Sequence, residues 1–277
     1  MRRRCGVLGD PIAHSLSPVL HRAAYAELGL DWGYDAHRVA SGGLPAFLAG
    51  LDGSWRGLSL TMPLKREVLP LVDLLTDRAR LAGAVNTVVL DDDGSRLGDN
   101  TDLPGAAAAV RERTSAPLAS AAILGGGATA TSVGLALADL GVRRIELLVR
   151  DASRAAETVQ ALGAHPDGVE VRTSPLDAGD EVVADVVVAT IPAAAQTAAL
   201  VARCAGVPVV FEALYDPWPT PLAASALSAP GDRVLVGGLD LLVHQAALQL
   251  ELFTGLPAPV EVMRRAGEQA LAGRHGS

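Results

Sequence analysis

Lysine is almost missing from this chain. Lys65 is the one lysine among 23 lysines and arginines, asparagine occurs only at Asn86 and Asn100, and isoleucine occurs four times. The pattern is typical of a coding bias against AT-rich codons, which replaces lysine by arginine wherever only positive charge is needed. Arginine keeps its proton in proteins, whereas lysine can release it. Lys65 is therefore a candidate for proton transfer, and an ordinary solvated surface charge is the alternative.

Other scarce features argue against several classes of protein. Aromatic residues make up 3% of the chain, and the net charge of −8 argues against nucleic acid or an anionic membrane as the main partner. Cys5 and Cys204 belong to no C-x-x-C or histidine cluster and predict reduced thiols in a cytoplasmic protein. The six histidines lack ligand spacing, so no metal site is expected. No apolar run reaches membrane-spanning length, and the apolar segment after the arginines at 2–4 is too short for a signal peptide.

The first third of the 277 residues predicts strands and helices with polar residues between them. Residues 5–9 read as a strand and residues 18–28 as a helix, with Ser17 as its N-cap and Pro18 in the first turn. Ser15 is not explained by capping. Two hydroxyl groups beside a helix N-terminus favour binding of a small anion such as a carboxylate.

The segment from residue 55 to residue 102 holds the lysine and both asparagines. A strand over 55–61 leads into Lys65, and strands over 85–90 and 95–98 flank an acidic turn. Asn86 lies within a strand pattern, where a turn does not explain it, whereas Asn100 fits a turn. An amide side chain offers both a donor and an acceptor, as a polyhydroxylated ligand requires.

A glycine turn begins the second half of the chain. A strand over 119–124, Gly125-Gly126-Gly127-Ala128, a helix to residue 140 and a strand over 145–149 form a βαβ unit, which predicts a dinucleotide site. After the second strand, Arg150 and Arg154 favour the 2′-phosphate of NADP. Asp151 between them leaves NAD open.

Further βα alternation follows, with strands predicted over 169–172, 182–190, 207–212 and 233–237. A proline-rich loop from Tyr215 to Pro221 comes after the carboxyl end of one of these strands, where ligands bind in open α/β sheets. The last two helices are expected over 239–253 and from residue 259 to about residue 271. Gln245 and Gln249 lie one turn apart on the first of them, and Gln245 serves either a structural network or a ligand.

Taken together, these motifs resemble those of the shikimate dehydrogenase family. The matching blocks are PIAHSLSP (11–18), LTMPLK (60–65), GAVNT (83–87), GDNTD (98–102), LGGGA (124–128), YDPWPTP (215–221) and GLDLLVHQ (238–245). They occur in family order and cover essentially the whole chain. The resemblance implies a reversible, NADPH-dependent reduction of 3-dehydroshikimate to shikimate in aromatic amino-acid biosynthesis.

The resemblance also implies a fold and a set of site residues. It implies two α/β domains facing across a cleft, with residues 1–102 and 239–277 binding shikimate and residues 103–238 forming a Rossmann-type NADP domain. Lys65 and Asp102 are implied as the catalytic pair. The implied substrate-binding residues are Ser15, Ser17, Thr61, Asn86, Tyr215 and Gln245, and the implied cofactor-binding residues are Gly125, Gly126, Gly127, Ala128, Arg150, Arg154, Thr190 and Gly238.

Four positions depart from the usual family pattern and leave alternatives open. Ser59 stands where many relatives have asparagine, Ala128 and Leu103 stand where glycine is common, and residues 149–151 read Val-Arg-Asp instead of Asn-Arg-Thr. A quinate or dual quinate/shikimate dehydrogenase using NAD, an enzyme for an amino-substituted analogue, and a non-catalytic nucleotide-sensing protein are the alternatives. Retention of Lys65 and Asp102 favours catalysis. The oligomeric state, monomer or homodimer, is open.

Overall fold

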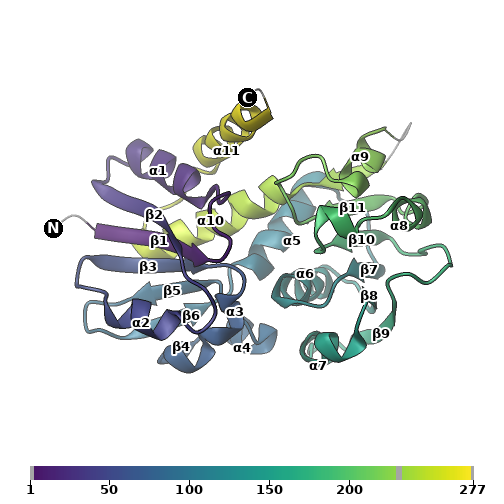
Figure 1. Cartoon of the computed structure of the whole chain (residues 1–277), viewed down its shortest axis with the longest axis horizontal. Coiled ribbons are helices and arrows are strands. Elements are labelled where there is room, and N and C mark those ends of the chain that lie inside the picture. Colours follow the sequence, from purple (N-terminus) through teal and green to yellow (C-terminus); the bar gives the residue numbers. More distant parts are fainter. Residues whose placement is uncertain (1–2, 229–232, 276–277) are drawn as a thin grey trace. The chain divides into compact units, whose positions relative to one another are not determined.

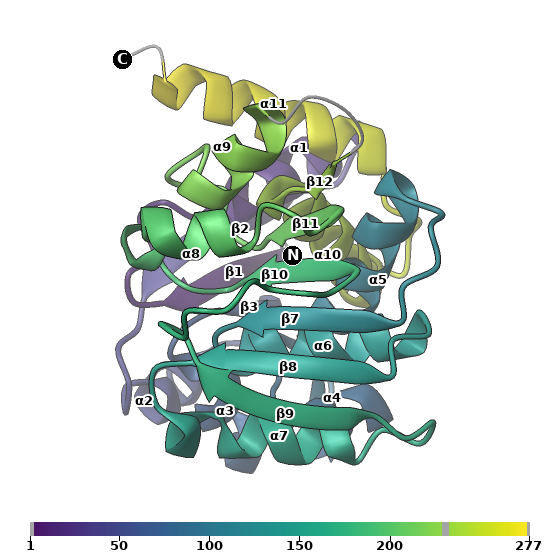
Figure 2. The same ribbon diagram turned by 90° about the vertical axis from the view of Figure 1, so that its right-hand side faces the viewer.

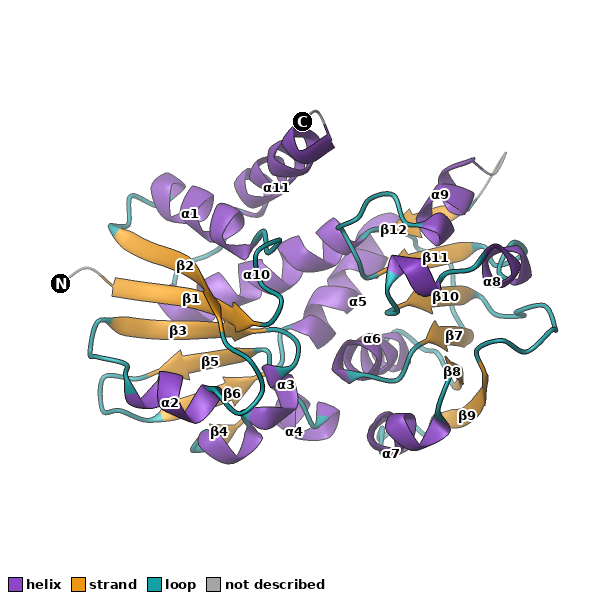
Figure 3. Cartoon of the chain, viewed as in Figure 1, coloured by secondary structure: helices purple, strands orange, loops and turns teal. Residues whose placement is uncertain are grey.

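A computed structural model describes residues 3–228 and 233–275, and the chain divides into two compact units. Unit 1 comprises Met1–Thr101 and Leu242–Ser277, and unit 2 comprises Asp102–Leu241. Each unit is an α/β structure built around its own six-stranded sheet (Figure 3). The expected α/β fold class is confirmed.

The sheet of unit 1 is mixed, with strand order β2-β1-β3-β5-β6-β4. β1 runs parallel to β2 and β3, whereas β5 runs antiparallel to β3 and β6. Its strands are β1 (Arg3–Gly9), β2 (Trp32–Arg38), β3 (Trp55–Leu60), β4 (Leu74–Leu75), β5 (Thr87–Leu90) and β6 (Arg96–Asp99). Leu8, Leu58 and Val88 from three of these strands lie in one fully buried aliphatic cluster, which is the core of the unit on this side of the sheet.

Among the residues that the structure describes, seven helices belong wholly or partly to unit 1, and Figure 1 shows where they lie along the chain. They are α1 (Ser17–Glu27), α2 (Leu44–Ala49), α3 (Leu64–Glu67), the 3-10 turn η1 (Leu69–Leu71), α4 (Asp77–Ala82), α10 (Gly238–Thr254) and α11 (Val260–His275). α10 approaches the sheet closely, because a Cβ atom on Gly57 would lie 2.2 Å from the ring of Phe253. Glycine at position 57 therefore lets the helix bring its glutamines against β3.

The sheet of unit 2 is entirely parallel, with strand order β12-β11-β10-β7-β8-β9. Its strands are β7 (Ser120–Leu124), β8 (Arg144–Val149), β9 (Glu170–Pro175), β10 (Val186–Ala189), β11 (Val209–Glu212) and β12 (Val234–Val236). β10 is completely buried, as a central strand covered on both faces must be. This is the doubly wound order, in which the direction of winding reverses between β7 and β10.

The helices of unit 2 cover both faces of its sheet. They are α5 (Asp102–Arg113), α6 (Ala128–Asp139), η2 (Ala152–Ala155), α7 (Ala156–Gly163), η3 (Ala193–Ala195), α8 (Ala198–Arg203) and α9 (Pro221–Ser228). Figure 2 shows α6 and α7 behind the strands and α8 and α9 in front of them. This arrangement follows from right-handed crossovers on either side of the reversal point.

Three local expectations were wrong. Ser17 is the first residue of α1, and Leu16 occupies the N-cap position without a side-chain cap. The strand expected over 182–190 begins only at Val186, because Asp185 instead accepts hydrogen bonds from the backbone and hydroxyl of Ser120. The strand expected over 85–90 begins only at Thr87, so Asn86 lies before it and not within it. β2 and β4 were not expected at all.

Both cysteines are free, buried thiols, and burial raises the pKa of Cys5 to about 12. Within residues 3–228 and 233–275, no helix is long and apolar enough to cross a membrane. The same residues hold no group of three or more His, Cys, Asp or Glu side chains arranged to bind a metal ion.

Candidate functional site

The predicted residues of unit 1 gather at one edge of its mixed sheet. The register pairs Leu8 with Leu60, Ser59 with Thr87, and Thr87 with Asp99. The chain therefore leaves β1, β3 and β6, and enters β5, at the same edge. These connections and α10 carry Ser15, Ser17, Thr61, Lys65, Asn86 and Gln245.

Ser15 precedes α1 by two residues, and Ser17 is the first residue of that helix. The Ser17 N–H donates to the Ser15 hydroxyl at 3.3 Å. The Ser17 side chain is buried. The hydroxyl groups are thus held beside the N-terminus of an 11-residue helix, which suits a carboxylate.

Lys65 lies in α3, and its backbone contacts Val85, the residue before Asn86. The Lys65 carbonyl accepts a hydrogen bond from the Val85 N–H at 2.7 Å, which fixes this turn against the start of the Asn86 segment. Thr61 precedes the same turn, and a Cβ atom on Gly9 would lie 2.3 Å from its methyl group. Glycine at position 9 therefore makes room for Thr61 at this edge.

Asn86 is buried at the centre of a hydrogen-bond network. Its Oδ1 accepts from the Thr101 N–H at 2.7 Å and from the Thr87 hydroxyl at 2.8 Å. Its Nδ2 donates to the Thr101 hydroxyl at 2.9 Å and to Gln245 Oε1 at 3.4 Å. Asn86 and Gln245, predicted separately from the sequence, therefore meet.

Gln249 belongs to the same network, one turn further along α10. Its Nε2 donates to the Thr87 hydroxyl at 3.0 Å, and its Oε1 accepts from the Ser59 hydroxyl at 2.7 Å. Ser59 in turn accepts from the Tyr34 phenol at 2.6 Å. Sequence reasoning missed Tyr34, Thr87 and Thr101, because tyrosine and threonine are common in strands and carried no signal.

A buried carboxylate fixes the segment that leads to Asp102. Asp99 is 1% exposed and accepts from Arg78 Nε and the Thr76 hydroxyl, each at 2.6 Å. Burial raises the pKa of Asp99, but the hydrogen bonds from Arg78 and Thr76 outweigh it and hold the pKa below its ordinary value. Asp102, the first residue of α5, comes two residues after Asn100 and directly after Thr101.

The predicted residues of unit 2 gather at the carboxyl edge of the parallel sheet. Thr190 follows β10, and its N–H and hydroxyl both donate to the Leu124 carbonyl at the end of β7, at 3.0 and 2.9 Å. This is the reversal point of the sheet, where ligands bind in doubly wound folds. The same edge carries Gly125, Gly126, Gly127, Ala128, Arg150, Arg154, Tyr215 and Gly238.

The glycine turn has the geometry that a pyrophosphate requires. Gly125 has φ of +112°, and a Cβ atom there would lie 2.4 Å from the Thr190 hydroxyl. A Cβ atom on Gly126 would lie 2.6 Å from Ala155. A Cβ atom on Gly127, the N-cap of α6, would meet no described atom within 4 Å, so the main chain there is open to a ligand. The turn therefore fits a dinucleotide.

Arg150, Asp151 and Arg154 follow β8, and the Asp151 carboxylate is hydrogen-bonded within its own turn. Arg150 and Arg154 are exposed. Asp151 Oδ1 accepts from the hydroxyl of Ser153 at 2.6 Å and from its N–H at 2.9 Å, and these bonds lower the pKa of Asp151. The carboxylate thus caps its own turn, and the guanidinium groups of Arg150 and Arg154 are exposed at the same loop.

Tyr215 lies on a loop that the buried Glu212 closes. The Glu212 carboxylate accepts from the Leu214 N–H at 3.0 Å and from the Thr220 hydroxyl at 2.6 Å, bridging the two ends of the loop. Burial raises the pKa of Glu212 in spite of these bonds. A Cβ atom on Gly238 would lie 2.4 Å from the carbonyl carbon of Leu214, so α10 begins directly against the base of the loop.

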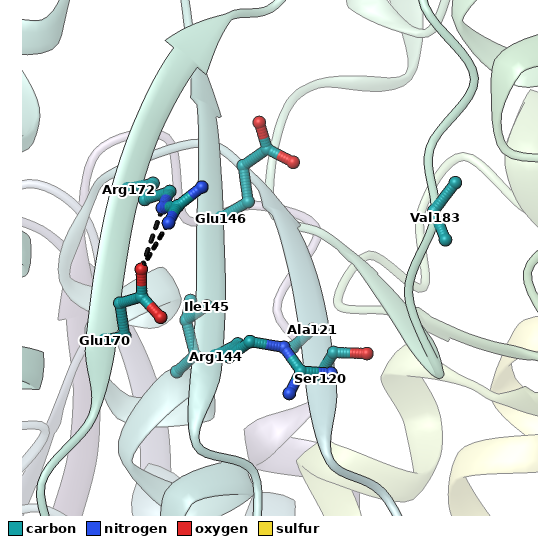
Figure 4. A pocket seen from close by; sticks show the side chains of 8 residues that line it. All are labelled: Ser120, Ala121, Arg144, Ile145, Glu146, Glu170, Arg172 and Val183. Atoms are coloured by element: carbon teal, nitrogen blue, oxygen red, sulfur yellow. Dashed lines mark hydrogen bonds and ion pairs between the residues drawn. The ribbon is translucent and has the colours of Figure 1, made fainter.

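A hollow of about 260 Å³ lies elsewhere on the parallel sheet, at the amino ends of β7, β8 and β9 (Figure 4). Arg144, Glu146, Glu170 and Arg172 line it, and Arg172 Nε donates to Glu170 at 2.9 Å. None of the predicted site residues lines this hollow. It is a charged face at the other end of the strands.

Two family models match the chain. The model of the shikimate dehydrogenase substrate binding domain matches residues 7–88, and the model of the shikimate 5'-dehydrogenase C-terminal domain matches residues 238–266. The sequence is 35% identical over 278 residues to shikimate dehydrogenase (NADP(+)) from Desulfitobacterium hafniense, covering 98% of this chain and 100% of that protein.

Solved structures agree with the sequence relatives. Shikimate dehydrogenase from Mycobacterium tuberculosis matches with a TM-score of 0.86 at 41% identity, covering 96% of this chain and 99% of that one. Quinate dehydrogenase from Corynebacterium glutamicum in complex with NAD matches with a TM-score of 0.87 at 29% identity, covering 97% of this chain and 99% of that one. Because the likeness to named relatives extends over nearly the full length of both chains, this chain belongs to the shikimate dehydrogenase family.

Proposed function

We propose that the chain catalyses the reversible, NADPH-dependent reduction of 3-dehydroshikimate to shikimate. The observation that carries this proposal is the contact between Asn86 and Gln245 at the edge of the unit 1 sheet, where the Val85 N–H also fixes the Lys65 turn. An ammonium group and a donor and acceptor pair suit a substrate that carries a reacting oxygen and ring hydroxyls. Family membership supports the same reaction, since the relative from Desulfitobacterium hafniense is named shikimate dehydrogenase (NADP(+)).

In this proposal each unit has one task. Unit 1 binds the substrate: Ser15 and Ser17 hold its carboxylate, and Thr61, Asn86 and Gln245 bind its hydroxyls and the reacting oxygen. Unit 2 binds NADP(H), which supplies the hydride, through residues Gly125, Gly126, Gly127, Ala128, Arg150, Arg154, Thr190 and Gly238. The glycine turn faces the pyrophosphate, and the arginines bind the 2′-phosphate.

Lys65 and Asp102 complete the chemistry. Reduction of the C3 carbonyl leaves an alkoxide, which the Lys65 ammonium stabilises and protonates. Asp102 orients the amine and binds the substrate oxygen. In the reverse direction, the neutral amine accepts the proton from the C3 hydroxyl.

Substitution of the lysine tests this mechanism. Lys65→Ala and Lys65→Arg lower kcat by about three orders of magnitude, since a positioned proton donor contributes roughly 10²–10⁴-fold, while shikimate still binds. Arg80→Ala removes an exposed cation from the same unit and keeps wild-type turnover, so it is the matched control. Most of the wild-type rate remaining in Lys65→Arg would refute the proton-donor role.

Quinate oxidation with NAD is the second candidate function. The likeness to the NAD-bound quinate dehydrogenase and the presence of Asp151 beside Arg150 favour it. Initial rates with shikimate and quinate, each with NADP and NAD, separate the two candidates. We expect the highest kcat/KM with shikimate and NADP. A higher value with quinate and NAD would replace the proposal.

A further inference from the structure

We propose that four buried residues polarise the Asn86 amide so that its nitrogen donates to a substrate hydroxyl while Gln245 accepts from it. The four residues, here called the polar chain, are Tyr34, Ser59, Gln249 and Thr87. None of them is assigned to substrate binding, and they act as positioning residues through Asn86. The inference rests on the proposed role of Asn86 in substrate binding.

The direction of the polar chain is set first at Gln249. The Asn86 carbonyl oxygen lies 3.3 Å from Gln249 Nε2. A main-chain carbonyl can only accept, so the nitrogen end of the Gln249 amide must face β5. The same nitrogen donates to the Thr87 hydroxyl at 3.0 Å. Gln249 Oε1 therefore points the other way, toward Ser59.

The orientation of Gln249 also fixes which groups of Ser59 and Tyr34 donate and which accept hydrogen bonds. The Ser59 hydroxyl lies 2.7 Å from Gln249 Oε1 and uses its single proton there. It must then accept from the Tyr34 phenol at 2.6 Å. Burial raises the pKa of Tyr34, so the phenol keeps the proton that it donates. Both side chains are less than 5% exposed, which excludes bulk water as an alternative partner.

The other end of the polar chain leads to the Asn86 oxygen. Thr87 accepts from Gln249, and the nearest acceptor for its own proton is Asn86 Oδ1 at 2.8 Å. The Thr101 N–H donates to the same oxygen at 2.7 Å. A main-chain N–H can only donate, so this contact independently identifies that end of the amide as oxygen. The Asn86 nitrogen is left facing the Thr101 hydroxyl and Gln245.

Gln245 has the opposite polarity. Its Nε2 donates to the Leu242 carbonyl at 2.9 Å, so the remaining Oε1 is an acceptor. Asn86 Nδ2 reaches it only at 3.4 Å, near the limit of a hydrogen bond. The pair therefore presents one donor and one acceptor. A hydroxyl group can accept from the first and donate to the second, whereas a carbonyl oxygen can only accept. The Asn86–Gln245 pair therefore favours a hydroxyl group over a carbonyl oxygen.

Replacing Thr87 tests the inference most directly. Thr87→Val keeps the shape of the side chain but removes the hydroxyl, and we expect the KM for shikimate to rise about tenfold with kcat within about twofold, the range of one buried hydrogen bond. An unchanged kcat with a raised KM indicates lost binding of the ground state and transition state alike. Thr87→Ser restores the hydroxyl and returns the KM to within about twofold of wild type.

Two tyrosines supply a matched control at the far end of the polar chain. Tyr34→Phe removes its terminal donor and raises the KM about threefold, a part of the same hydrogen-bond range. Tyr25→Phe removes an equally buried phenol hydroxyl from the same core, outside the polar chain and without a hydrogen-bond partner among the described residues, so it leaves the KM unchanged and does not lower the melting temperature. Equal KM changes in the two phenylalanine variants would assign Tyr34 a structural role only.

One further variant keeps this test separate from that of the proposed function. If Asn86→Ala raises the KM for shikimate and Thr87→Val does not, the polar chain has no positioning role and the inference fails. If Asn86→Ala itself leaves the KM unchanged, the proposed role of Asn86 fails instead.

Discussion

The two sheet edges that carry the candidate residues hold them by different means. At the mixed sheet of unit 1, buried side chains hold one another, as Asn86, Thr87 and Gln249 do. At the parallel sheet of unit 2, main-chain conformation and close approach hold Gly125, and the arginines beyond it are exposed.

The difference follows from what each edge is proposed to bind. A small polyhydroxylated acid must be distinguished group by group, so the polarity of each side chain matters. A dinucleotide presents phosphates, to which main-chain N–H groups and guanidinium groups bind. Substitutions should therefore impair binding at the edge of unit 1 when they remove a polar side-chain group. At the edge of unit 2, they should impair binding when they change the main-chain conformation.

Gly125→Ala is the most damaging change expected at the edge of unit 2. Gly125 has a φ of +112°, which alanine rarely adopts. An alanine Cβ atom at this position would also lie only 2.4 Å from the Thr190 hydroxyl. Strain of this kind costs about 1–3 kcal/mol, so we expect a lower melting temperature and a KM for NADPH raised about 5- to 150-fold. The KM for shikimate changes less.

Gly127→Ala is the control for this change. Gly127 has φ of −94°, and its Cβ position is open, so stability stays at the wild-type level. A raised KM for NADPH in this variant then reports contact between the main chain and the nucleotide. Equal loss of melting temperature in both variants would contradict the comparison.

Lowering the pH should reduce the stability of unit 1, because His21 is buried in its neutral form. Its ring is fully buried and stacks on Tyr34 at 4.1 Å between centroids, and burial lowers its pKa from 6.5 to about 3. The stability that depends on neutral His21 is complete above pH 6.5 and is lost as the pH falls toward 3, because the unfolded chain takes up the proton first. The loss is about 1.4 kcal/mol per pH unit in this window.

Urea unfolding at several pH values measures this loss. In His21→Phe, the free energy of unfolding should vary less between about pH 6.5 and pH 5 than in wild type, by about 2 kcal/mol. His37, whose pKa burial also lowers, is present in both proteins and cancels in the difference. Parallel pH profiles of wild type and variant would show that His21 is not the source.

Arg150→Ala sharpens the contrast between the cofactors. A charge-assisted hydrogen bond to the 2′-phosphate is worth about 1.5–3 kcal/mol, so the KM for NADPH should rise at least about tenfold. The KM for NADH, which lacks this phosphate, stays the same. Arg144→Ala, an exposed arginine at the other end of the same strand, is the matched control. Equal effects on both cofactors would place Arg150 away from the 2′-phosphate.

Asp151→Asn should have the smallest effect. Asparagine keeps an oxygen for the Ser153 cap and removes one negative charge next to Arg150. We expect the KM for NADPH to fall about two- to threefold at low salt and less at high salt, because exposed charges are screened. The same change in the KM for NADH would rule out the 2′-phosphate as the cause.

Much of the fold could be predicted because its signals are local. The apolar strands and the glycine turn of unit 2 lie within one βαβ segment, and its cofactor edge follows from them. β2 has only one buried residue, Tyr34, among seven, so it offers no apolar run to detect. Ser17 was misplaced because a serine before proline is also a common first residue of a helix.

The candidate site was predicted less completely. Lys65, Asn86 and Gln245 stand out because their residue types are rare or unexpected where they occur. Their supporting partners do not, since a serine or threonine in a strand is ordinary. Ser59 and Gln249 also lie 190 residues apart, so their contact exists only in the folded chain.

Because Lys65 is the one lysine of the chain, its side-chain amine in α3 can be labelled as a spectroscopic probe. Reductive methylation with isotope-labelled formaldehyde modifies lysine and the α-amino group of the first residue, so an NMR spectrum of the product contains one side-chain signal, that of Lys65. Each ligand can then be titrated against the amine that is proposed to transfer the proton. An acylating reagent likewise has only one lysine and the α-amino group to attack, so inactivation that shikimate prevents can be traced to one of two amines.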